Sequence, residues 1–315
     1  MRILITGGAG YIGTELVYAL ANNTAIENIT VFDNLSRGNY NLFLGKQINS
    51  EKVKFVHGEL LDSRNIRKVL KDIDVVYHLA AKVTTPFANL DGHIFEQVNH
   101  WGTAELMYAL EENPVKQLIF ISSTAVYGST TEPATEATEP KPDSFYSISK
   151  QRAELHVQRL FNKTNTLIIR LGNVYGYSKS MRFDAAINRI MFDAHYTGRI
   201  TINGTGYQHR SFIHINKVTA VLSQLLNQTI PSGLYNLVDK TLSIMDISEA
   251  LQNVYPGLES FFINQNYAGH DLQVERNSKL LQYVPLAEST LEQELRSFKE
   301  QFSFNIGGTG DVYVI

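Results

Sequence analysis

The chain of 315 residues has no cysteine, one tryptophan and no long apolar run. The lack of cysteine excludes a disulfide scaffold, a thiolate zinc site and a cysteine nucleophile. No apolar stretch is long enough to cross a bilayer or to form a signal peptide. Because 28 Lys and Arg nearly balance 31 Asp and Glu, there is no bulk attraction to nucleic acid or to an anionic membrane. We therefore predict a cytoplasmic globular protein without nucleic-acid or membrane partners.

Short apolar runs alternate with helical patterns in the first part of the chain. The runs are apolar on both faces, as buried parallel strands are, and they occupy 2–5, 29–32, 53–56, 75–78, 118–121 and 167–171. Apolar residues at helical spacing occupy 11–21, 64–70, 95–111 and 147–161. This alternation predicts a doubly wound, Rossmann-type α/β sheet.

The length favours about two domains, and the strand–helix pattern loosens after residue 172. We predict a cofactor-binding domain over 1–172 and a smaller, mainly substrate-binding region over 173–315. One short apolar run, 235–238, is expected to return to the sheet of the first domain. The glycines of 307–310 predict a flexible turn near the end of the chain.

A glycine-rich sequence, TGGAGYIG at 6–13, follows the first predicted strand and opens the first predicted helix. Gly7 permits a tight turn, Gly10 lets the backbone approach a pyrophosphate, and Gly13 permits close contact between helix and strand. The helix N-terminus offers free amides to phosphates. Asp33 ends the second strand 20 residues after Gly13. This context predicts a dinucleotide site, and the alternative is a glycine turn without a ligand.

The type of dinucleotide depends on Asp33 and Arg37. A carboxylate at the end of the second strand accepts hydrogen bonds from both ribose hydroxyls and repels a 2′-phosphate. Asp33 therefore favours NAD over NADP. Arg37 favours NADP instead, because a guanidinium can bind a 2′-phosphate. The alternative for Arg37 is a solvated loop charge.

Tyr146 and Lys150 are four residues apart on a predicted helix, so their side chains share one face. The pKa of free tyrosine is about 10, and a neighbouring cation favours the phenolate. Such a tyrosine can take a proton from a hydroxyl while hydride leaves the same carbon. Ser122, Ser123 and Thr124 stand at the end of the fifth predicted strand, where a hydroxyl would face the ligand. The alternatives are a surface helix pair and a capping serine.

With these elements, the chain resembles the extended short-chain dehydrogenase/reductase family, and in particular its sugar-nucleotide epimerases. The resemblance covers nearly the whole chain, to about residue 302. Further segments are similar to segments of this family. Residues 31–36 resemble its ribose-binding strand end, 58–62 its adenine-side strand end and 78–81 the strand beside the cofactor. Residues 99–103 resemble a helix segment with an asparagine, 122–128 the active-site strand and 170–176 the strand that leads to the substrate.

The resemblance implies two sets of site residues beside the catalytic Ser123, Tyr146 and Lys150. The set for NAD is Gly7, Gly10, Tyr11, Ile12, Gly13, Asp33, Asn34, Ser36, Arg37, Gly38, Glu59, Leu60, Leu79, Ala80, Ala81, Val83, Asn99, Tyr146 and Lys150. The set for a nucleotide sugar is Thr84, Ser123, Thr124, Tyr146, Asn173 and Arg210.

The resemblance also implies a mechanism and an assembly. Tyr146 removes a proton from a sugar hydroxyl, hydride passes to NAD, the keto-sugar rotates, and hydride returns to the opposite face. Lys150 holds the nicotinamide ribose and lowers the pKa of the tyrosine, while Ser123 binds the reacting oxygen. The helices that carry Trp101 and Tyr146 pack against a second subunit in this family. We therefore predict a homodimer through a four-helix bundle.

Departures from the family pattern concern the substrate. The 4,6-dehydratases carry an Asp-Glu pair where this chain has Thr124 and Ala125. Neither residue can act as an acid or base, so dehydration is disfavoured. Arg210 matches a phosphate-binding arginine, but a later one is absent. His270 or Arg276 is the candidate to replace it.

We therefore predict an NAD-dependent sugar-nucleotide epimerase, reacting at C4. One alternative is a net oxidoreductase of the same family, either a ketosugar reductase or an alcohol dehydrogenase. Another is a non-catalytic dinucleotide sensor, a class that typically loses the tyrosine or the lysine. The histidines are scattered without the spacing of metal ligands, so no metal site is predicted.

Overall fold

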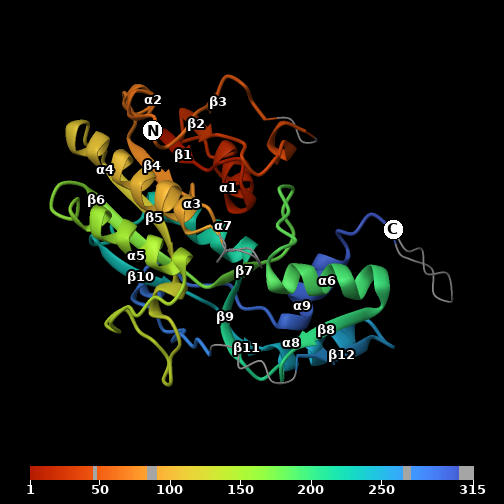
Figure 1. The fold of residues 1–315 in the computed structure, drawn as a ribbon. Helices are drawn as coiled ribbons and strands as arrows, with labels where there is room; N and C mark the ends of the chain where they lie inside the picture. Colours follow the sequence, from red (N-terminus) through yellow and green to blue (C-terminus); the bar gives the residue numbers. More distant parts are fainter. Residues whose placement is uncertain (45–47, 84–90, 265–270, 305–315) are drawn as a thin grey trace.

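The computed structural model describes residues 1–44, 48–83, 91–264 and 271–304. Its main sheet has seven strands in the order β10-β6-β5-β4-β1-β2-β3 (Figure 1), and all neighbours run parallel. The strands are β1 (Arg2–Thr6), β2 (Asn28–Asp33), β3 (Val53–His57), β4 (Val75–His78), β5 (Gln117–Ser123), β6 (Asn165–Leu171) and β10 (Gly233–Leu237). The strand order reverses between β1 and β4. This is the doubly wound topology that the sequence predicted, and it places the ligand side at the carboxyl ends of the strands.

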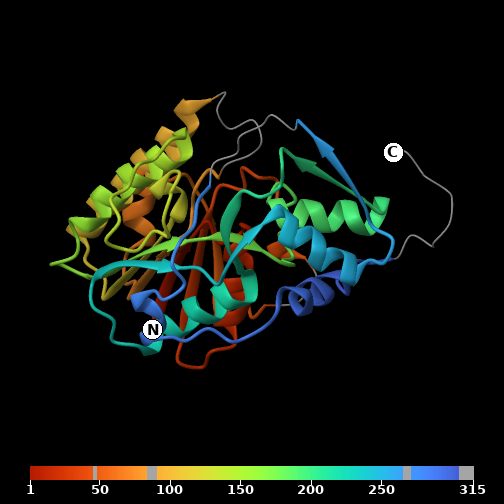
Figure 2. The same ribbon diagram turned by 90° about the horizontal axis from the view of Figure 1, so that it is seen from below.

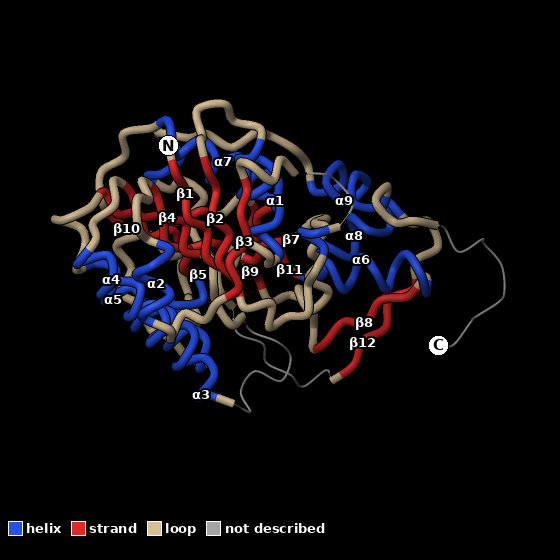
Figure 3. Tube along the Cα trace, turned by 90° about the horizontal axis from the view of Figure 1, so that it is seen from above, coloured by secondary structure: helices blue, strands red, loops and turns tan. Residues whose placement is uncertain are grey.

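Helices cover both faces of this sheet. One layer contains α1 (Tyr11–Ala21) and α7 (Ile215–Gln224), and the other contains α2 (Ser63–Val69), α4 (Gly102–Glu112) and α5 (Phe145–Gln158). Figures 2 and 3 show the strands between these two layers. Strands covered on both faces must be apolar throughout, which is why the short apolar runs predicted all of them.

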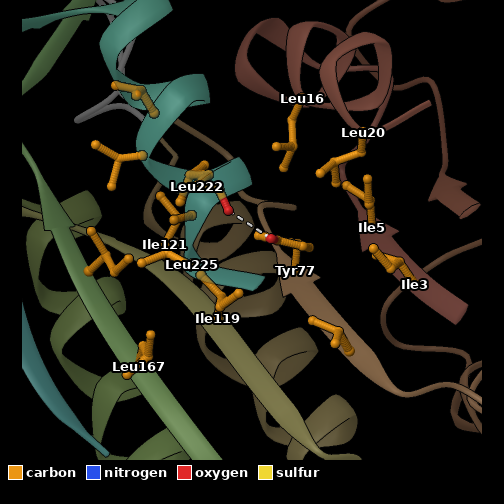
Figure 4. Packing of buried hydrophobic residues seen from close by; sticks show 14 of the residues in the cluster. Ile3, Ile5, Leu16, Leu20, Tyr77, Ile119, Ile121, Leu167, Leu222 and Leu225 are labelled. Atoms are coloured by element: carbon orange, nitrogen blue, oxygen red, sulfur yellow. Dashed lines mark hydrogen bonds between the residues drawn. The ribbon is translucent and has the colours of Figure 1, made fainter. Parts of the chain in front are cut away.

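The core beneath α1 and α7 consists of aliphatic side chains from both helices and from the sheet (Figure 4). Tyr77 of β4 is fully buried in it, and its hydroxyl donates a hydrogen bond to the carbonyl of Leu222, 2.7 Å away. A buried hydroxyl needs such a partner. This contact attaches α7, which comes late in the chain, to the middle of the sheet.

The predicted helix at 95–111 is confirmed, but it contains a wide turn. A short helix, α3 (Gly92–Phe95), passes through the π-helical turn η3 (Glu96–Trp101) into α4. Such wide turns inside helices often occur at functional sites. Here the turn carries Asn99, a predicted site residue, into the interior.

A smaller part of the molecule lies beside the carboxyl ends of the main sheet (Figure 1). It contains the sheet β11-β9-β7, the pair β12-β8 and three helices that share one apolar core. The elements are β7 (Asn173–Tyr175), β8 (Arg199–Asn203), β9 (His209–His214), β11 (Lys240–Ser243), β12 (Glu259–Ile263), α6 (Ala186–Thr197), α8 (Ile244–Val254) and α9 (Leu291–Lys299).

The predicted return to the main sheet is confirmed, because β10 pairs with β6. The domain boundary at residue 172 stays a prediction. The glycine turn at 307–310 lies outside the described residues. None of the described helices has the length and apolar content that a membrane crossing requires. The cytoplasmic location and the absence of nucleic-acid partners stay predictions.

Candidate active site

The turn between β1 and α1 requires glycine at two positions. Gly7 has a φ of 71°, and a Cβ there would lie 2.6 Å from the backbone of Ala80. A Cβ on Gly13 would lie 2.3 Å from the carbonyl oxygen of Gly7. The turn is therefore pressed against both the end of β4 and the first turn of α1. This close packing brings the free amides at the start of α1 to the switch point of the sheet.

Asp33 is held beside this turn by two backbone amides. Its carboxylate oxygens accept hydrogen bonds from Ala9, at 3.0 Å, and from Leu35, at 2.8 Å. Next to it, the Asn34 amide donates to Glu59 over 2.8 Å, which joins the ends of β2 and β3. The acidic and amide side chains predicted for the adenosine end thus gather at one edge of the sheet.

Arg37, on the loop after β2, has a carboxylate partner. Its guanidinium forms an ion pair with Asp184, at 3.1 Å, across 147 residues of sequence. Asp184 precedes α6 and also contacts Arg182, at 3.2 Å. The ion pair partly offsets the charge that favoured NADP, and the role of Arg37 at the cofactor stays a prediction.

Asn99 clamps the chain that follows β4. Its side chain accepts a hydrogen bond from the amide of Lys82, at 2.7 Å, and donates to the carbonyl of the same residue, at 2.9 Å. It also donates to the Ser149 hydroxyl on α5, at 3.0 Å. Asn99 therefore connects the segment after β4, which includes the predicted cofactor residues Ala80 and Ala81, to α5, the helix that carries Tyr146. Thr84 lies outside the described residues.

The structure brings the three predicted catalytic residues to the carboxyl end of β5. Ser123 is the last residue of β5, its hydroxyl accepts a hydrogen bond from the amide of Ala125, at 3.2 Å, and it acts on the phenol of Tyr146 on the first turn of α5. One turn later, the buried ammonium of Lys150 donates to the carbonyl of Ile121, at 2.6 Å. It also lies 4.4 Å from the centroid of the Phe120 ring. A hydroxyl, a phenol and an ammonium therefore share one strand end.

The charge states at this site have identifiable causes. Burial raises the pKa of Tyr146 above its ordinary value, while the hydrogen bond with Ser123 and the positive charge of Arg182 lower it. Burial lowers the pKa of Lys150 to about 7. The ammonium of Lys150 is directed at the carbonyl of Ile121, and its effect on the pKa of Tyr146 stays a prediction.

A pocket of about 130 Å³ lies in front of Ser123. Four of the residues predicted for the substrate line it, brought together from β5, β7, β9 and the turn η4 (Thr124–Tyr127). The lining residues are Ser123, Thr124, Ala125, Gly128, Asp143, Asn173, Arg210 and Leu272. Asn173 also donates to the carbonyl of Ser211, at 3.2 Å, which joins β7 to β9 at the pocket wall.

Sequence reasoning missed Asp143, Leu272 and Arg182. Asp143 ends a polar loop three residues before Tyr146, and Leu272 pairs with Arg210 in an isolated bridge. Only the position of Asp143, close before the catalytic tyrosine, was a usable signal. No local pattern indicated that Arg182, 36 residues beyond Tyr146, would act on its phenol.

Tyr11, predicted as a cofactor residue, forms hydrogen bonds through its hydroxyl with residues of the smaller part. Its hydroxyl donates to the carbonyl of Gly176, at 2.6 Å, and accepts from Asn188, at 3.1 Å. Thr14, one turn further along α1, bonds to Ser180, at 2.7 Å. The phosphate-binding helix is therefore fixed to the loop that carries Arg182.

Arg276, one candidate to replace the missing phosphate arginine, has two carboxylate partners in the structure, and its role stays a prediction. Its guanidinium contacts Asp239, at 3.3 Å, and Glu288, at 3.0 Å, so two carboxylates already neutralise it. His270, the other candidate, lies outside the described residues. Among the described residues no three His, Asp or Glu side chains gather as metal ligands do, and the absence of a metal site stays a prediction.

The sheet, the glycine turn and the serine, tyrosine and lysine define an enzyme that uses a nicotinamide dinucleotide. The model of the NAD dependent epimerase/dehydratase family matches residues 3–237. The chain belongs to this family, and its cofactor is NAD. The residues present fit this cofactor, because Gly7 and Gly13 have no room for a side chain in the turn that leads into the α1 amides, and Asp33 is held beside that turn.

Both epimerases and dehydratases are among the proteins that are similar to this chain. The dTDP-D-glucose 4,6-dehydratase of Bos taurus is 28% identical over 256 residues, 79% of this chain and 72% of the relative. A putative UDP-glucose 4-epimerase of Methanocaldococcus jannaschii is 30% identical over 233 residues, 71% of this chain and 73% of the relative. The UDP-glucuronic acid 4-epimerase of Bacillus cereus was solved with UDP-4-deoxy-4-fluoro-glucuronic acid and NAD. It superposes with a TM-score of 0.83 at 26% identity, covering 95% of this chain and 98% of that one.

Proposed function

We propose that this protein is an NAD-dependent epimerase of a nucleotide-activated sugar and that it inverts C4. The observation that carries the proposal is the pocket lined by Ser123, which acts on the nearby phenol of Tyr146, and by Thr124 and Ala125, which follow Ser123 in the chain. A hydroxyl and a methyl side chain supply no acid or base for eliminating water. Among the described residues that follow Ser123 in the chain, the site therefore has the groups for moving one proton at one carbon and no acid–base pair.

The chain's own residues divide the work of proton transfer. Tyr146 takes the proton of the sugar hydroxyl; burial raises the pKa of its phenol, while Ser123 and Arg182 favour the phenolate that accepts the proton. Ser123 holds the reacting oxygen, and Lys150 holds the nicotinamide ribose. When bound, NAD supplies the transient acceptor for hydride, which then returns to the opposite face of the sugar. Each residue ends the cycle in the protonation state in which it began, as an isomerase requires.

Arg210 is the residue we assign to the diphosphate of the substrate. It projects from β9 into the same pocket as Ser123, and a guanidinium recognises phosphate oxygens in a fork of two hydrogen bonds. The relatives solved or named with UDP- and dTDP-sugars support an anionic nucleotide sugar as the substrate class.

The second candidate is 4,6-dehydration. Asp143 brings one carboxylate to the pocket, and dehydratases are among the similar proteins. A panel of UDP- and dTDP-sugars, incubated with the purified protein and followed by proton NMR, separates the reactions. Epimerisation gives the C4 epimer, dehydration gives a 4-keto-6-deoxy sugar, and net oxidoreduction changes the absorbance at 340 nm stoichiometrically. No turnover of any sugar would contradict the proposal.

We also propose that the protein is a homodimer through the face formed by α4 and α5. Large apolar side chains are exposed there, including Trp101 at 51% and Leu155 at 60%. Exposed apolar groups gathered on one face are typical of an interface. Light scattering at micromolar concentration is expected to give a dimer, and Leu155→Glu a monomer. A monomeric wild-type protein would contradict this assignment.

A further inference from the structure

A buried ion pair lies directly behind the catalytic lysine. Glu154, on α5, accepts two hydrogen bonds from the guanidinium of Arg170 on β6, at 2.9 and 2.6 Å. A third comes from the Ser122 hydroxyl of β5, at 2.5 Å. Both charged side chains are nearly inaccessible, 3% exposed for Arg170 and 2% for Glu154. Neither residue lines the pocket in front of Ser123.

Burial of such a pair is costly unless the geometry is very good. Here the fork is bidentate, the carboxylate has a third donor, and the guanidinium lies 4.7 Å from the centroid of the Tyr127 ring. Replacement of buried ion pairs by apolar residues of similar volume is often neutral for stability. The free energy of unfolding alone therefore does not explain why a charged pair, Glu154 and Arg170, is buried here.

The position of Glu154 gives a different reason. It is one helical turn beyond Lys150, so both side chains project from the same face of α5 toward β5. Lys150 is equally buried, and its other neighbours are the carbonyl of Ile121 and the Phe120 ring. Burial opposes the charge of Lys150, whereas the carboxylate of Glu154 favours it.

The remaining charged or titratable groups around Lys150 do not replace this carboxylate. His78 of β4 is fully buried, and burial together with Lys150 lowers its pKa to about 3, so it is neutral. Tyr146 carries a negative charge only while it is the phenolate that accepts the substrate proton, and burial raises its pKa against that state. Arg170 has the same sign as Lys150 and acts on it from beyond Glu154.

We infer that Glu154, held by Arg170 and Ser122, is a positioning residue that keeps Lys150 as an ammonium ion and holds α5 against β5. The bonds from Ser122 and Arg170 attach the helix to the two strands behind the site. Ser122 is the immediate neighbour of Ser123, so the same carboxylate helps to keep the phenol of Tyr146 opposite Ser123. The inference rests on the proposed role of Lys150 in catalysis.

Three variants test the inference in the NAD-loaded enzyme. Glu154→Gln removes the negative charge and leaves Arg170 unpaired. The double variant Glu154→Met with Arg170→Met removes both charges and keeps the volume, so it retains the fold if the single variant does not. Glu154→Asp keeps the charge. The matched control is Glu294→Gln, which removes a carboxylate from the buried Lys217 and Lys240 cluster of the smaller part.

The readout is the pKa of Lys150, followed by NMR of ¹³C-labelled lysine, together with the pH profile of kcat. Loss of a negative neighbour favours the neutral amine, so the pKa of Lys150 falls and the alkaline limb of kcat moves to lower pH. We expect a displacement of about one pH unit in the double variant, a larger one in Glu154→Gln and recovery in Glu154→Asp. A displacement of one unit is about a tenfold loss of kcat above both pKa values, with KM for the nucleotide sugar little changed.

The inference is overturned if the folded double variant keeps the wild-type pKa of Lys150 and the wild-type pH profile. An equal displacement in Glu294→Gln also contradicts it, because the effect would then be general. If the wild-type protein turns over no nucleotide sugar, the proposed function fails. The NMR titration of Lys150 still decides this inference in that case.

Discussion

The cofactor side and the substrate side of the active site are built in different ways. On the cofactor side, the main chain determines the shape of the site. Gly7 and Gly13 are packed against neighbouring main chain, and two backbone amides donate hydrogen bonds to Asp33. On the substrate side, side chains such as Asn173 and Arg210 converge from separate strands and loops. Backbone geometry follows from local sequence, whereas convergence of side chains depends on how distant segments meet. The substrate specificity that we propose therefore rests on the side that is harder to predict from the sequence.

The largest effect is expected where the two sides meet. Tyr146→Phe removes the group that takes the substrate proton, and general acid–base catalysis contributes about 100- to 10,000-fold. We expect kcat to fall by that factor while NAD remains bound and the melting temperature is unchanged. Steady-state kinetics with absorbance of released NAD provide the measurement. Unchanged turnover on an accepted nucleotide sugar would refute the catalytic assignment.

A smaller effect is expected from the substrate side alone. Arg210→Ala removes a charge-assisted contact to phosphate, which stabilises binding by about 1.5–3 kcal/mol. KM should rise roughly 10- to 150-fold, while retention of NAD stays at the wild-type level. Arg189→Ala, which removes an exposed cation of α6 paired with Asp193 at 3.0 Å, is the control. A loss of NAD in Arg210→Ala would show that the two sides are not separable.

The reverse pattern is expected from the cofactor side. Gly13→Ala places a Cβ 2.3 Å from the carbonyl oxygen of Gly7, so the backbone must shift. Overpacking of this kind costs about 1–3 kcal/mol, and we expect a lower melting temperature and loss of co-purifying NAD. Gly233→Ala on β10, where a Cβ finds ordinary contacts of 3.5 Å, should behave as wild type. Full NAD content in Gly13→Ala would speak against the phosphate cradle.

The smallest effect concerns the ion pair that joins the two sides. Asp184→Asn releases Arg37, which is partly exposed, and such pairs contribute about 0–1 kcal/mol. NAD should dissociate up to roughly five-fold faster. Because Arg37 is then available to a 2′-phosphate, NADP should bind better relative to NAD. Calorimetry with both dinucleotides measures the ratio, and an unchanged preference would mean that the pair has no part in selecting the cofactor.

The same contrast explains what the sequence could predict. Buried parallel strands need apolar residues on both faces, so the short runs at 2–5 or 118–121 indicated β1 and β5. Asp33 and Ser123 were predictable because a strand end in this topology faces the ligand. The π-helical turn that turns Asn99 inward had no comparable signal.

Residues whose role depends on distant contacts could not be predicted. Leu272 reaches the pocket because its segment pairs with Arg210, and Arg37 meets Asp184 across 147 residues. Arg276 matched the need for a cation near the phosphates, yet Asp239 and Glu288 neutralise it. In each case the sequence offered a suitable residue type, and only tertiary packing determined its partner.

The most direct test of the account follows one sample by proton NMR and by absorbance at 340 nm. The purified protein, with no added dinucleotide, is incubated with UDP- and dTDP-sugars. The account predicts that a C4 epimer accumulates to equilibrium while the absorbance at 340 nm stays constant. A 4-keto-6-deoxy product, or a stoichiometric change of absorbance that requires added dinucleotide, would contradict it.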